Sequence, residues 1–337
     1  MAHSNISIFV PHVGCPHTCS FCNQRTITGV EQIPNADDVR ETCTQALSEV
    51  ADYKSTEIAF FGGSFTAIPR DYMLELLNAA FEFVGNDKFG GIRISTRPDC
   101  IDEDILALLK AHGVTAIELG AQSMSDKVLK ANERGHTSDD VIRASELIKQ
   151  NGFELGLQMM TGLYQSSSAD DIYTMQEIIK LKPKTVRIYP VAVLKGTKLA
   201  SLYQSGEYKL VSFDEMVKLC VEMLKAFHNA EIDVIRCGLH SSETVEQDIV
   251  AGFYHPAFRE ICISQLFRYA IEKYADKSIK TEVYVSGSSI STAVGHKKAN
   301  KQYFEENGYI IDFKVDNTLE KDEIRINKDV YNVFEIT

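Results

Sequence analysis

The chemistry in this chain is concentrated in three cysteines that lie within eight residues, Cys15, Cys19 and Cys22. Their spacing, C-x3-C-x2-C, puts three thiolates on one short loop, where they can ligate three irons of a cubane 4Fe–4S cluster and leave the fourth iron open. An open metal position is a docking point for a substrate or cosubstrate. Zinc is the alternative metal, with His12 or His17 as the fourth ligand.

The cysteine loop follows the first of seven short segments whose apolar or alternating residues predict β-strands. Amphipathic stretches lie between these segments, and Asn35, Ser168 and Ser212 are expected to cap three of them. Strands that alternate with helices predict parallel pairing, because parallel strands need long crossover connections. The expected strands are 6–10, 57–61, 92–96, 116–119, 154–159, 185–189 and 233–236, and the expected helices are 36–52, 70–84, 102–112, 139–151, 169–181 and 212–229.

Residues that can bind ligands follow several of the expected strands. The cysteines come after the first strand, Gly62-Gly63-Ser64 after the second, Arg97 after the third and Gln122 after the fourth. The carboxyl ends of parallel strands meet at one rim, so these groups should lie together. The pattern predicts an α/β fold, a partial (β/α) TIM-type barrel of about six to seven parallel strands.

The pattern changes near residue 275. Three short strands are expected at 282–285, 309–315 and 323–326, with one helix near 297–306. We therefore expect a barrel domain over residues 1–275 and a small C-terminal α+β extension over residues 276–337.

Composition limits the class of partner. The chain of 337 residues has 35 Lys and Arg against 47 Asp and Glu, a net charge of −12. A net charge of this sign argues against binding of nucleic acid through the overall charge of the protein, although a local basic patch can bind RNA. The absence of an apolar run of about 18 residues and of signal-peptide regions leads us to expect a cytoplasmic protein without membrane contact. Its eight cysteines are expected to be reduced thiols or ligands.

The cysteine loop, with Phe21 beside its last cysteine, resembles the signature of the radical S-adenosylmethionine (SAM) superfamily. The resemblance implies that the open iron binds SAM, and that an electron from an external reductant cleaves SAM to a 5′-deoxyadenosyl radical. Later motifs resemble the catalytic subunit of the Elongator complex, a modifier of the tRNA wobble uridine, and more distantly the oxygen-independent coproporphyrinogen III oxidases. We expect no counterpart of the Elongator subunit's acetyltransferase domain. The motifs begin at Phe61, Ser95, Leu119, Asn132, Gln158 and Arg187, and the match covers about residues 5–265.

The resemblance also implies contacts with SAM. Arg134 matches an arginine that pairs with the methionine carboxylate, where a planar guanidinium suits bidentate contact. The segment Gly62-Gly63-Ser64 matches a glycine-rich motif whose backbone meets the methionine amino group. The other implied contacts are Phe21 and Val191 at the adenine, Gln158 at the ribose, Ser95 at the ribose or the amine, and Arg97 and Gln122 near the cosubstrate. No catalytic residue is implied.

Three functions remain open at this point. The first is a radical SAM enzyme that modifies tRNA, and the second is a radical SAM enzyme on a small or tetrapyrrole-like metabolite. The third is a non-catalytic relative that binds the cluster or haem. If RNA is the substrate, the cations expected to contact its phosphates are Arg97, Arg259, Arg268, Lys297, Lys298 and Lys301.

Overall fold

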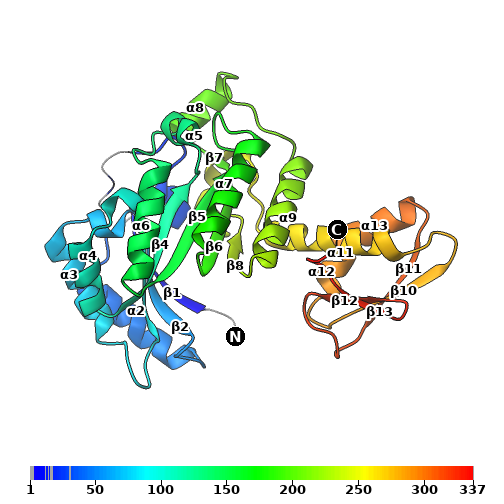
Figure 1. Ribbon diagram of the computed structural model, residues 1–337, viewed down its shortest axis with the longest axis horizontal. Helices are drawn as coiled ribbons and strands as arrows, with labels where there is room; N and C mark the ends of the chain where they lie inside the picture. The colour runs from blue at the N-terminus through cyan, green and yellow to red at the C-terminus, as the bar shows by residue number, and fades with distance from the viewer. Residues whose placement is uncertain (1–3, 12, 14, 16–17, 30–31, 337) are drawn as a thin grey trace. The chain divides into compact units, whose positions relative to one another are not determined.

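The computed structural model describes residues 4–11, 13, 15, 18–29 and 32–336, and it confirms the predicted parallel α/β architecture. Seven strands form the main sheet in the order β1-β2-β3-β4-β5-β6-β8 (Figure 1). Every pair from β1 to β6 is parallel, as expected for a partial TIM-type barrel. The strands are β1 (Ser4–Val10), β2 (Thr56–Gly62), β3 (Gly91–Thr96), β4 (Val114–Gln122), β5 (Glu154–Thr161), β6 (Thr185–Pro190) and β8 (Asp233–Cys237).

The chain divides into two compact units. The first comprises Met1–Leu210 and Leu239–Tyr254, and the second comprises Val211–Gly238 and His255–Thr337. Both units are discontinuous in sequence, a feature that a left-to-right reading of the chain does not suggest. The domain boundary between residues 275 and 276 stays a prediction.

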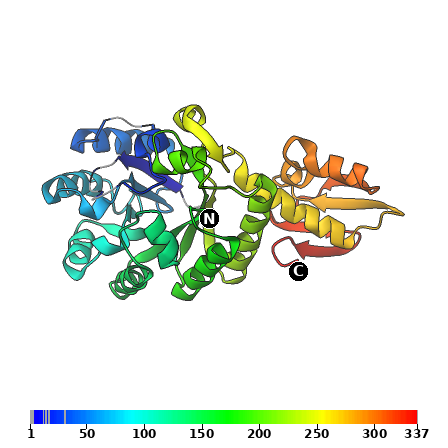
Figure 2. The ribbon, with the colours of Figure 1, turned by 90° about the horizontal axis from the view of Figure 1, so that it is seen from above.

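Helices of the first unit pack along the outer side of the curved sheet (Figure 2). Asn35 caps its helix through a reciprocal capping box, as predicted, whereas the cap of α7 is Ser167 rather than Ser168. The helices are α1 (Gln24–Thr28), α2 (Ala36–Glu49), η1 (Phe65–Ala67), α3 (Arg70–Phe81), η2 (Pro98–Cys100), α4 (Glu103–Ala111), α5 (Asp126–Ala131), α6 (Ser138–Gln150), α7 (Ser168–Leu181), α8 (Lys198–Gln204) and α10 (Glu243–Asp248). A short antiparallel pair, β7 (Ala192–Leu194) and β9 (Ile249–Gly252), was not predicted.

The second unit contains two long helices and a four-stranded sheet in the order β11-β10-β12-β13. Ser212 caps α9 with a capping box, as predicted. The elements are α9 (Phe213–Asn229), β8, α11 (Phe258–Tyr274), β10 (Lys280–Val285), α12 (Ile290–Val294), η3 (His296–Lys298), α13 (Ala299–Glu306), β11 (Ile310–Val315), β12 (Glu323–Ile326) and β13 (Asp329–Asn332).

The basic cluster of the second unit differs from the sequence-based expectation. Lys297 and Lys298 were expected in a helix, but both have left-handed backbone angles, with φ of 52° and 65°, and precede α13. Only Lys301 lies within α13, where its ammonium is 3.9 Å from the carboxylate of Glu305. The three lysines therefore do not form one helical face. Within the described residues, no helix is long and apolar enough to cross a membrane.

The inner side of the sheet carries an ion network instead of an apolar core. Arg93 on β3, which is 1% exposed, donates to Glu57 on β2 at 2.7 Å and to Glu154 on β5 at 2.6 Å. Glu118 on β4, also 1% exposed, accepts two hydrogen bonds from Arg187 on β6 at 2.7 and 2.9 Å. Its nearest oxygen is 3.6 Å from Arg93 Nη1. The network therefore links five neighbouring strands through their inward side chains.

We expect Arg93→Met to lower the free energy of unfolding by about 3–5 kcal/mol, because removal of one buried partner leaves carboxylates without compensation. Chemical denaturation measures this change. Arg40→Met is the matched control, since the Arg40–Glu82 pair is exposed and should contribute little. Equal effects of the two substitutions would contradict a structural role for the network.

Candidate functional site

The three cysteines lie on the segment between β1 and α1, at the carboxyl end of β1. Cys19 is buried, whereas Cys15 and Cys22 are half-buried, and all three are free thiols. Burial, followed by the neighbouring Cys19 and Cys15, raises the pKa of Cys22 to about 12. Cys19 and Cys15 therefore lie close enough to Cys22 to disfavour its thiolate. His12 and His17, the alternative zinc ligands, lie outside the described residues.

The segment after β4 holds the cysteine loop in place. Ser20 donates its hydroxyl to Asn132 Oδ1 at 2.8 Å and its backbone N–H to the Asn132 carbonyl at 3.1 Å. Asn132 is fully buried, and its Nδ2 donates to the carbonyls of Val128 and Tyr164, both at 2.9 Å. The loop is therefore held by the residue that ends α5, for which no role was predicted.

Arg134 reaches the cysteine loop from the same segment. Its Nη1 lies 3.0 Å from Cys19 Sγ and its Nη2 donates to the Gly120 carbonyl at 2.7 Å. The side chain is 7% exposed, and Nε has no hydrogen-bond partner within the part of the chain that the structure describes. Gln122 at the end of β4 has a left-handed φ of 63°, and its buried Oε1 is likewise without a partner there. These two unsatisfied atoms require an explanation such as a missing ligand.

The pair Gly62-Gly63 is required by close backbone contact. A Cβ on Gly62, whose φ is +113°, would lie 2.9 Å from the Val10 carbonyl oxygen, and one on Gly63 would lie 2.5 Å from that of Val13. Gln24, on the helix after the cysteines, donates Nε2 to the Gly62 carbonyl at 2.6 Å. The glycines therefore join the end of β2 to the cysteine segment. Gln24 was not predicted, and no spacing in the sequence marks it.

The predicted residues Ser95 and Gln158 meet on the inner side of the sheet. Gln158 Nε2 donates to Ser95 Oγ at 3.2 Å and to Glu118 Oε2 at 2.8 Å. Burial opposes ionisation of Glu118, but the charges of Arg187 and Arg93 outweigh it and hold the pKa of this carboxyl below its usual value. Glu118 and Arg187 were not predicted. Their signal was a charge at an alternate position of an otherwise apolar strand.

The remaining predicted residues, Arg97, Phe21 and Val191, either already have hydrogen-bond partners or are buried. Arg97 forms a fork with Asp99 at 2.9 and 2.8 Å, and its backbone N–H donates to Ser64 Oγ at 3.0 Å. Phe21 is 8% exposed, and Val191 is fully buried beside β7. The roles implied for these residues toward SAM stay predictions.

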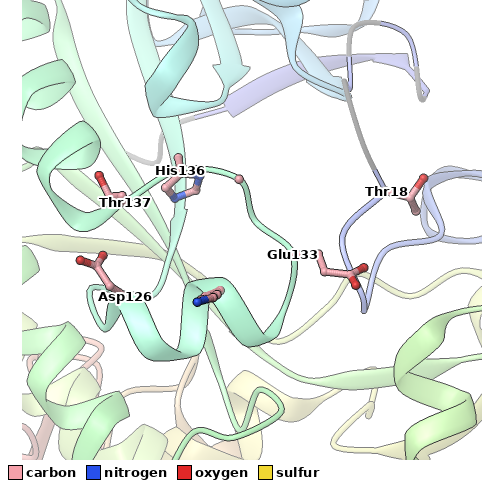
Figure 3. Close-up of a pocket in the computed structure, with 7 residues that line it drawn as sticks. Thr18, Asp126, Glu133, His136 and Thr137 are labelled. Atoms are coloured by element: carbon pink, nitrogen blue, oxygen red, sulfur yellow. The ribbon is translucent and has the colours of Figure 1, made fainter.

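A cavity of about 630 Å³ adjoins the cysteine loop (Figure 3). Thr18 and Glu133 lie on one side of it, and Asp126 and Thr137 lie on the other. The buried His136 hydrogen-bonds through Nε2 to the Ala121 carbonyl at 3.2 Å. Burial, followed by the charge of Arg134, lowers the pKa of His136 to about 4, so its ring is neutral at pH 7. The lining residues are Thr18, Asp126, Lys130, Glu133, Gly135, His136 and Thr137.

The donor set of the cysteine loop fits an iron–sulfur cluster better than a single ion. Among the residues that the structure describes, no group of three or more His, Cys, Asp or Glu side chains converges on one metal ion. A cubane needs no such convergence, because each thiolate ligates a different iron. The loop supplies three free thiols, one for each of three irons, and the guanidinium of Arg134 lies beside Cys19.

Two sequence models of protein families match this chain. Residues 9–176 match the Radical SAM superfamily, and residues 183–268 match the Radical_SAM C-terminal domain.

Among curated proteins, an uncharacterized protein of Methanocaldococcus jannaschii is 28% identical over 222 residues, 65% of this chain and 65% of the relative. Elongator complex protein 3 of Dictyostelium discoideum is 30% identical over 191 residues, 51% of this chain and 34% of the relative. The tRNA uridine(34) acetyltransferase of M. jannaschii is 36% identical over 130 residues, 37% of this chain and 24% of the relative. The chain thus spans less than two thirds of the length of these relatives.

Solved structures share the fold. Elp3 of Methanocaldococcus infernus matches 81% of this chain and 63% of that chain, with a TM-score of 0.61 and 21% identity. Coproporphyrinogen III oxidase (HemN) of Escherichia coli matches 67% of this chain and 52% of that chain, with a TM-score of 0.51 and 16% identity.

We expect Asn132→Ala to lower the free energy of unfolding by about 1–3 kcal/mol and to loosen the cysteine loop, because buried acceptors and the Ser20 hydroxyl lose their partner. Hydrogen-exchange mass spectrometry should show faster exchange in the peptide that contains Ser20. Asn307→Ala, at an exposed helix end, is the control and should leave that peptide unchanged. Unchanged exchange in the Asn132 variant would show that the clamp is dispensable.

Proposed function

Because the chain belongs to the radical SAM superfamily, we propose that it cleaves SAM reductively at a 4Fe–4S cluster and uses the resulting radical to modify tRNA. Membership of this superfamily indicates an enzyme. The observation that carries the proposal is the contact between Arg134 and Cys19 at the carboxyl end of the sheet. It puts Arg134, the arginine expected to pair with the methionine carboxylate, beside one of the predicted cluster ligands.

Cys15, Cys19 and Cys22 are the proposed ligands of the cluster. When bound, the cluster and SAM supply one chemistry: an electron from an external reductant breaks a carbon–sulfur bond of SAM and yields methionine and a 5′-deoxyadenosyl radical. The raised pKa of Cys22 supports the assignment, because a desolvated thiolate needs positive charge nearby and iron would supply it. The guanidinium of Arg134 adds a fixed positive charge beside Cys19.

The residues around Arg134 are the proposed contacts of SAM. The unsatisfied Nε of Arg134 is a donor suited to a carboxylate, and the unsatisfied Oε1 of Gln122 is an acceptor suited to an amine or hydroxyl. The segment Gly62-Gly63-Ser64 is proposed at the methionine amino group, and its glycines pack against the backbone of Val10 and Val13. Ser95 and Gln158 are proposed at the ribose, and Phe21 and Val191 at the adenine. Arg97, whose fork is bound to Asp99, is proposed to position the glycine-rich segment through Ser64.

The choice of tRNA rests on two relatives. The matched segments belong to proteins described as a tRNA uridine(34) acetyltransferase and as Elongator complex protein 3. The candidate phosphate contacts in the second unit are Lys297, Lys298 and Arg268, of which Lys297 and Lys298 are exposed. Arg268 stacks its guanidinium on the Tyr303 ring at 4.5 Å, which leaves its charge available to an anion.

The proposed function is tested by anaerobic reconstitution followed by addition of dithionite, SAM and total tRNA. We expect 5′-deoxyadenosine to form, and its rate to rise severalfold with tRNA. The variant in which Cys15, Cys19 and Cys22 are all replaced by Ala should form none. Cys43→Ala is the matched control, because Cys43 is a fully buried thiol of α2, and it should behave as the wild type.

The assay separates the two parts of the proposal. Absence of 5′-deoxyadenosine from a cluster-loaded protein would contradict SAM cleavage. Formation of 5′-deoxyadenosine without any response to tRNA would contradict tRNA as substrate and leave SAM cleavage standing.

A further inference from the structure

The second unit contains a strand–helix–helix–strand arrangement near its carboxyl end. β10 leads into α12, a four-residue turn connects α12 to α13, and α13 leads into β11, which pairs with β10 in parallel. The two helices contact each other, and both contact β11 (Figure 1). The second matched family model ends at residue 268, before any of these elements. The match to the superfamily therefore assigns them no role.

The turn between the two helices has the sequence Gly295-His296-Lys297-Lys298. Gly295 has a φ of +95°, and a Cβ on it would lie 2.6 Å from the backbone nitrogen of Asn300, so the position requires glycine. The N–H of Lys298 donates to the Gly295 carbonyl at 2.8 Å and closes the turn. The three residues after Gly295 are exposed. The turn thus presents one histidine and two lysines to solvent where the two helices meet.

A buried side chain holds the helices on both sides of the turn. Asn300 on α13 is 3% exposed, and its Nδ2 donates to the Ala293 carbonyl on α12 at 3.0 Å. The same amide donates to the carbonyl and the hydroxyl of Ser264 on α11, at 2.8 and 3.0 Å. A buried and satisfied polar network of this kind rigidifies its surroundings. The turn is therefore preorganised, which lowers the entropic cost of binding a ligand.

The lysines of the turn are available to an anion. Among the side chains described, no carboxylate forms an ion pair with Lys297 or Lys298. By contrast, Lys280 on β10 and Lys314 on β11 each pair with a carboxylate of the neighbouring strand. The positive charge of this part of the second unit is therefore neutralised on the two strands and remains unbalanced at the turn.

A second histidine lies against the turn and responds to its charge. The ring centres of His255 and His296 are 5.0 Å apart. Burial, followed by the charges of His296 and Lys297, lowers the pKa of His255, and the opposing charge of Glu260 is too weak to reverse the shift. The surroundings of the turn thus disfavour a further cation, as expected for a site that attracts anions.

The connectivity of this segment is similar to that of an RNA-binding module. In KH domains, a G-x-x-G turn clamps the backbone of a single-stranded nucleic acid. Here Lys298 replaces the second glycine of that pattern, but its φ of 65° keeps the left-handed conformation that glycine adopts without strain. The replacement retains the shape of the turn and adds a cation.

We infer that the turn of residues 295–298 binds the phosphodiester backbone of single-stranded RNA, with Lys297 and Lys298 at phosphates, and that the second unit is an RNA-binding module in its own right. The inference extends the proposed function, in which the two lysines are candidate phosphate contacts, and RNA is chosen over DNA because the proposed substrate is tRNA. It does not require SAM cleavage. Phosphate contacts carry no sequence information, so binding should tolerate many sequences.

The test measures binding of the full-length, reconstituted protein to a fluorescent single-stranded RNA by anisotropy at several salt concentrations. Lys297→Asp should weaken binding about fivefold at low salt, and the slope of log affinity against log salt should become shallower by about 0.7, the value for one lost phosphate contact on a single strand. Aspartate tolerates the left-handed backbone of this position, where φ is 52°, so the turn should keep its shape.

Lys328→Asp is the matched control. It makes the same change of charge at an exposed lysine between β12 and β13 of the same unit, and it should leave both the affinity and the salt slope unchanged. Thermal melting checks that each variant is folded. If Lys297→Asp does not fold, Lys297→Asn carries the same test, with an expected loss of about threefold and the same change of slope.

Equal affinity and slope in the wild type and the Lys297 variant would overturn the inference, and so would an equal loss in the Lys328 variant. Tighter binding of the duplex, or of single-stranded DNA of the same sequence, would also overturn it. Formation of 5′-deoxyadenosine without RNA is measured in parallel and should be the same in wild type and Lys297→Asp, because the turn contains no proposed contact of the cluster or SAM.

The two readouts separate this inference from the proposed function. A protein that forms 5′-deoxyadenosine but binds RNA independently of Lys297 refutes only the inferred module. A cluster-loaded protein that forms no 5′-deoxyadenosine, yet loses RNA affinity in the Lys297 variant, refutes only SAM cleavage.

Discussion

The guanidinium of Arg134 joins the cysteine loop to the sheet, and the arrangement of the whole site depends on this contact. One nitrogen meets Cys19 Sγ at 3.0 Å, and another donates to the carbonyl of Gly120 on β4 at 2.7 Å. A guanidinium is planar and remains charged, so it fixes both the distance and the charge between the two segments. Asn132, two residues earlier, holds the same loop through Ser20. The thiols are therefore placed by β4 and its following segment, as well as by their own short loop.

The inner side of the same sheet holds buried charges, which are paired with one another. Buried charges are costly when they are unpaired, and the network of Arg93, Arg187 and Glu118 satisfies them across several strands. These contacts link the strands through charged side chains rather than through a packed apolar core. Phe9 and Phe61 lie at the carboxyl ends of β1 and β2, next to the cysteine segment.

Much of the fold could be predicted from the sequence, because hydrophobic periodicity and capping residues are local signals. The seven parallel strands and the capping roles of Asn35 and Ser212 follow from such signals. The positions of the cysteines and of Gly62 after β1 and β2 also follow, since the carboxyl ends of parallel strands share one rim, whereas Arg134 was implied by the family resemblance.

Other features depend on contacts that no local pattern encodes. The pairing of Arg187 with Glu118 needs the register of three strands, and its contact with Phe61 needs the curvature of the sheet. Gln24 reaches Gly62 only because β1 and β2 are neighbours. The left-handed backbone of Lys297 and Lys298 interrupts a stretch whose composition is compatible with a helix. Sequence patterns thus indicate elements and rims, whereas three-dimensional contacts decide which side chains meet.

The central claim is that the cysteine loop, held by Arg134, carries a 4Fe–4S cluster with one iron open to SAM. Electron paramagnetic resonance of the reconstituted and reduced protein tests this most directly, in samples that contain about four irons per chain. The account predicts that addition of SAM changes the spectrum of the reduced cluster, because SAM binds the open iron. A spectrum that is identical with and without SAM would contradict it.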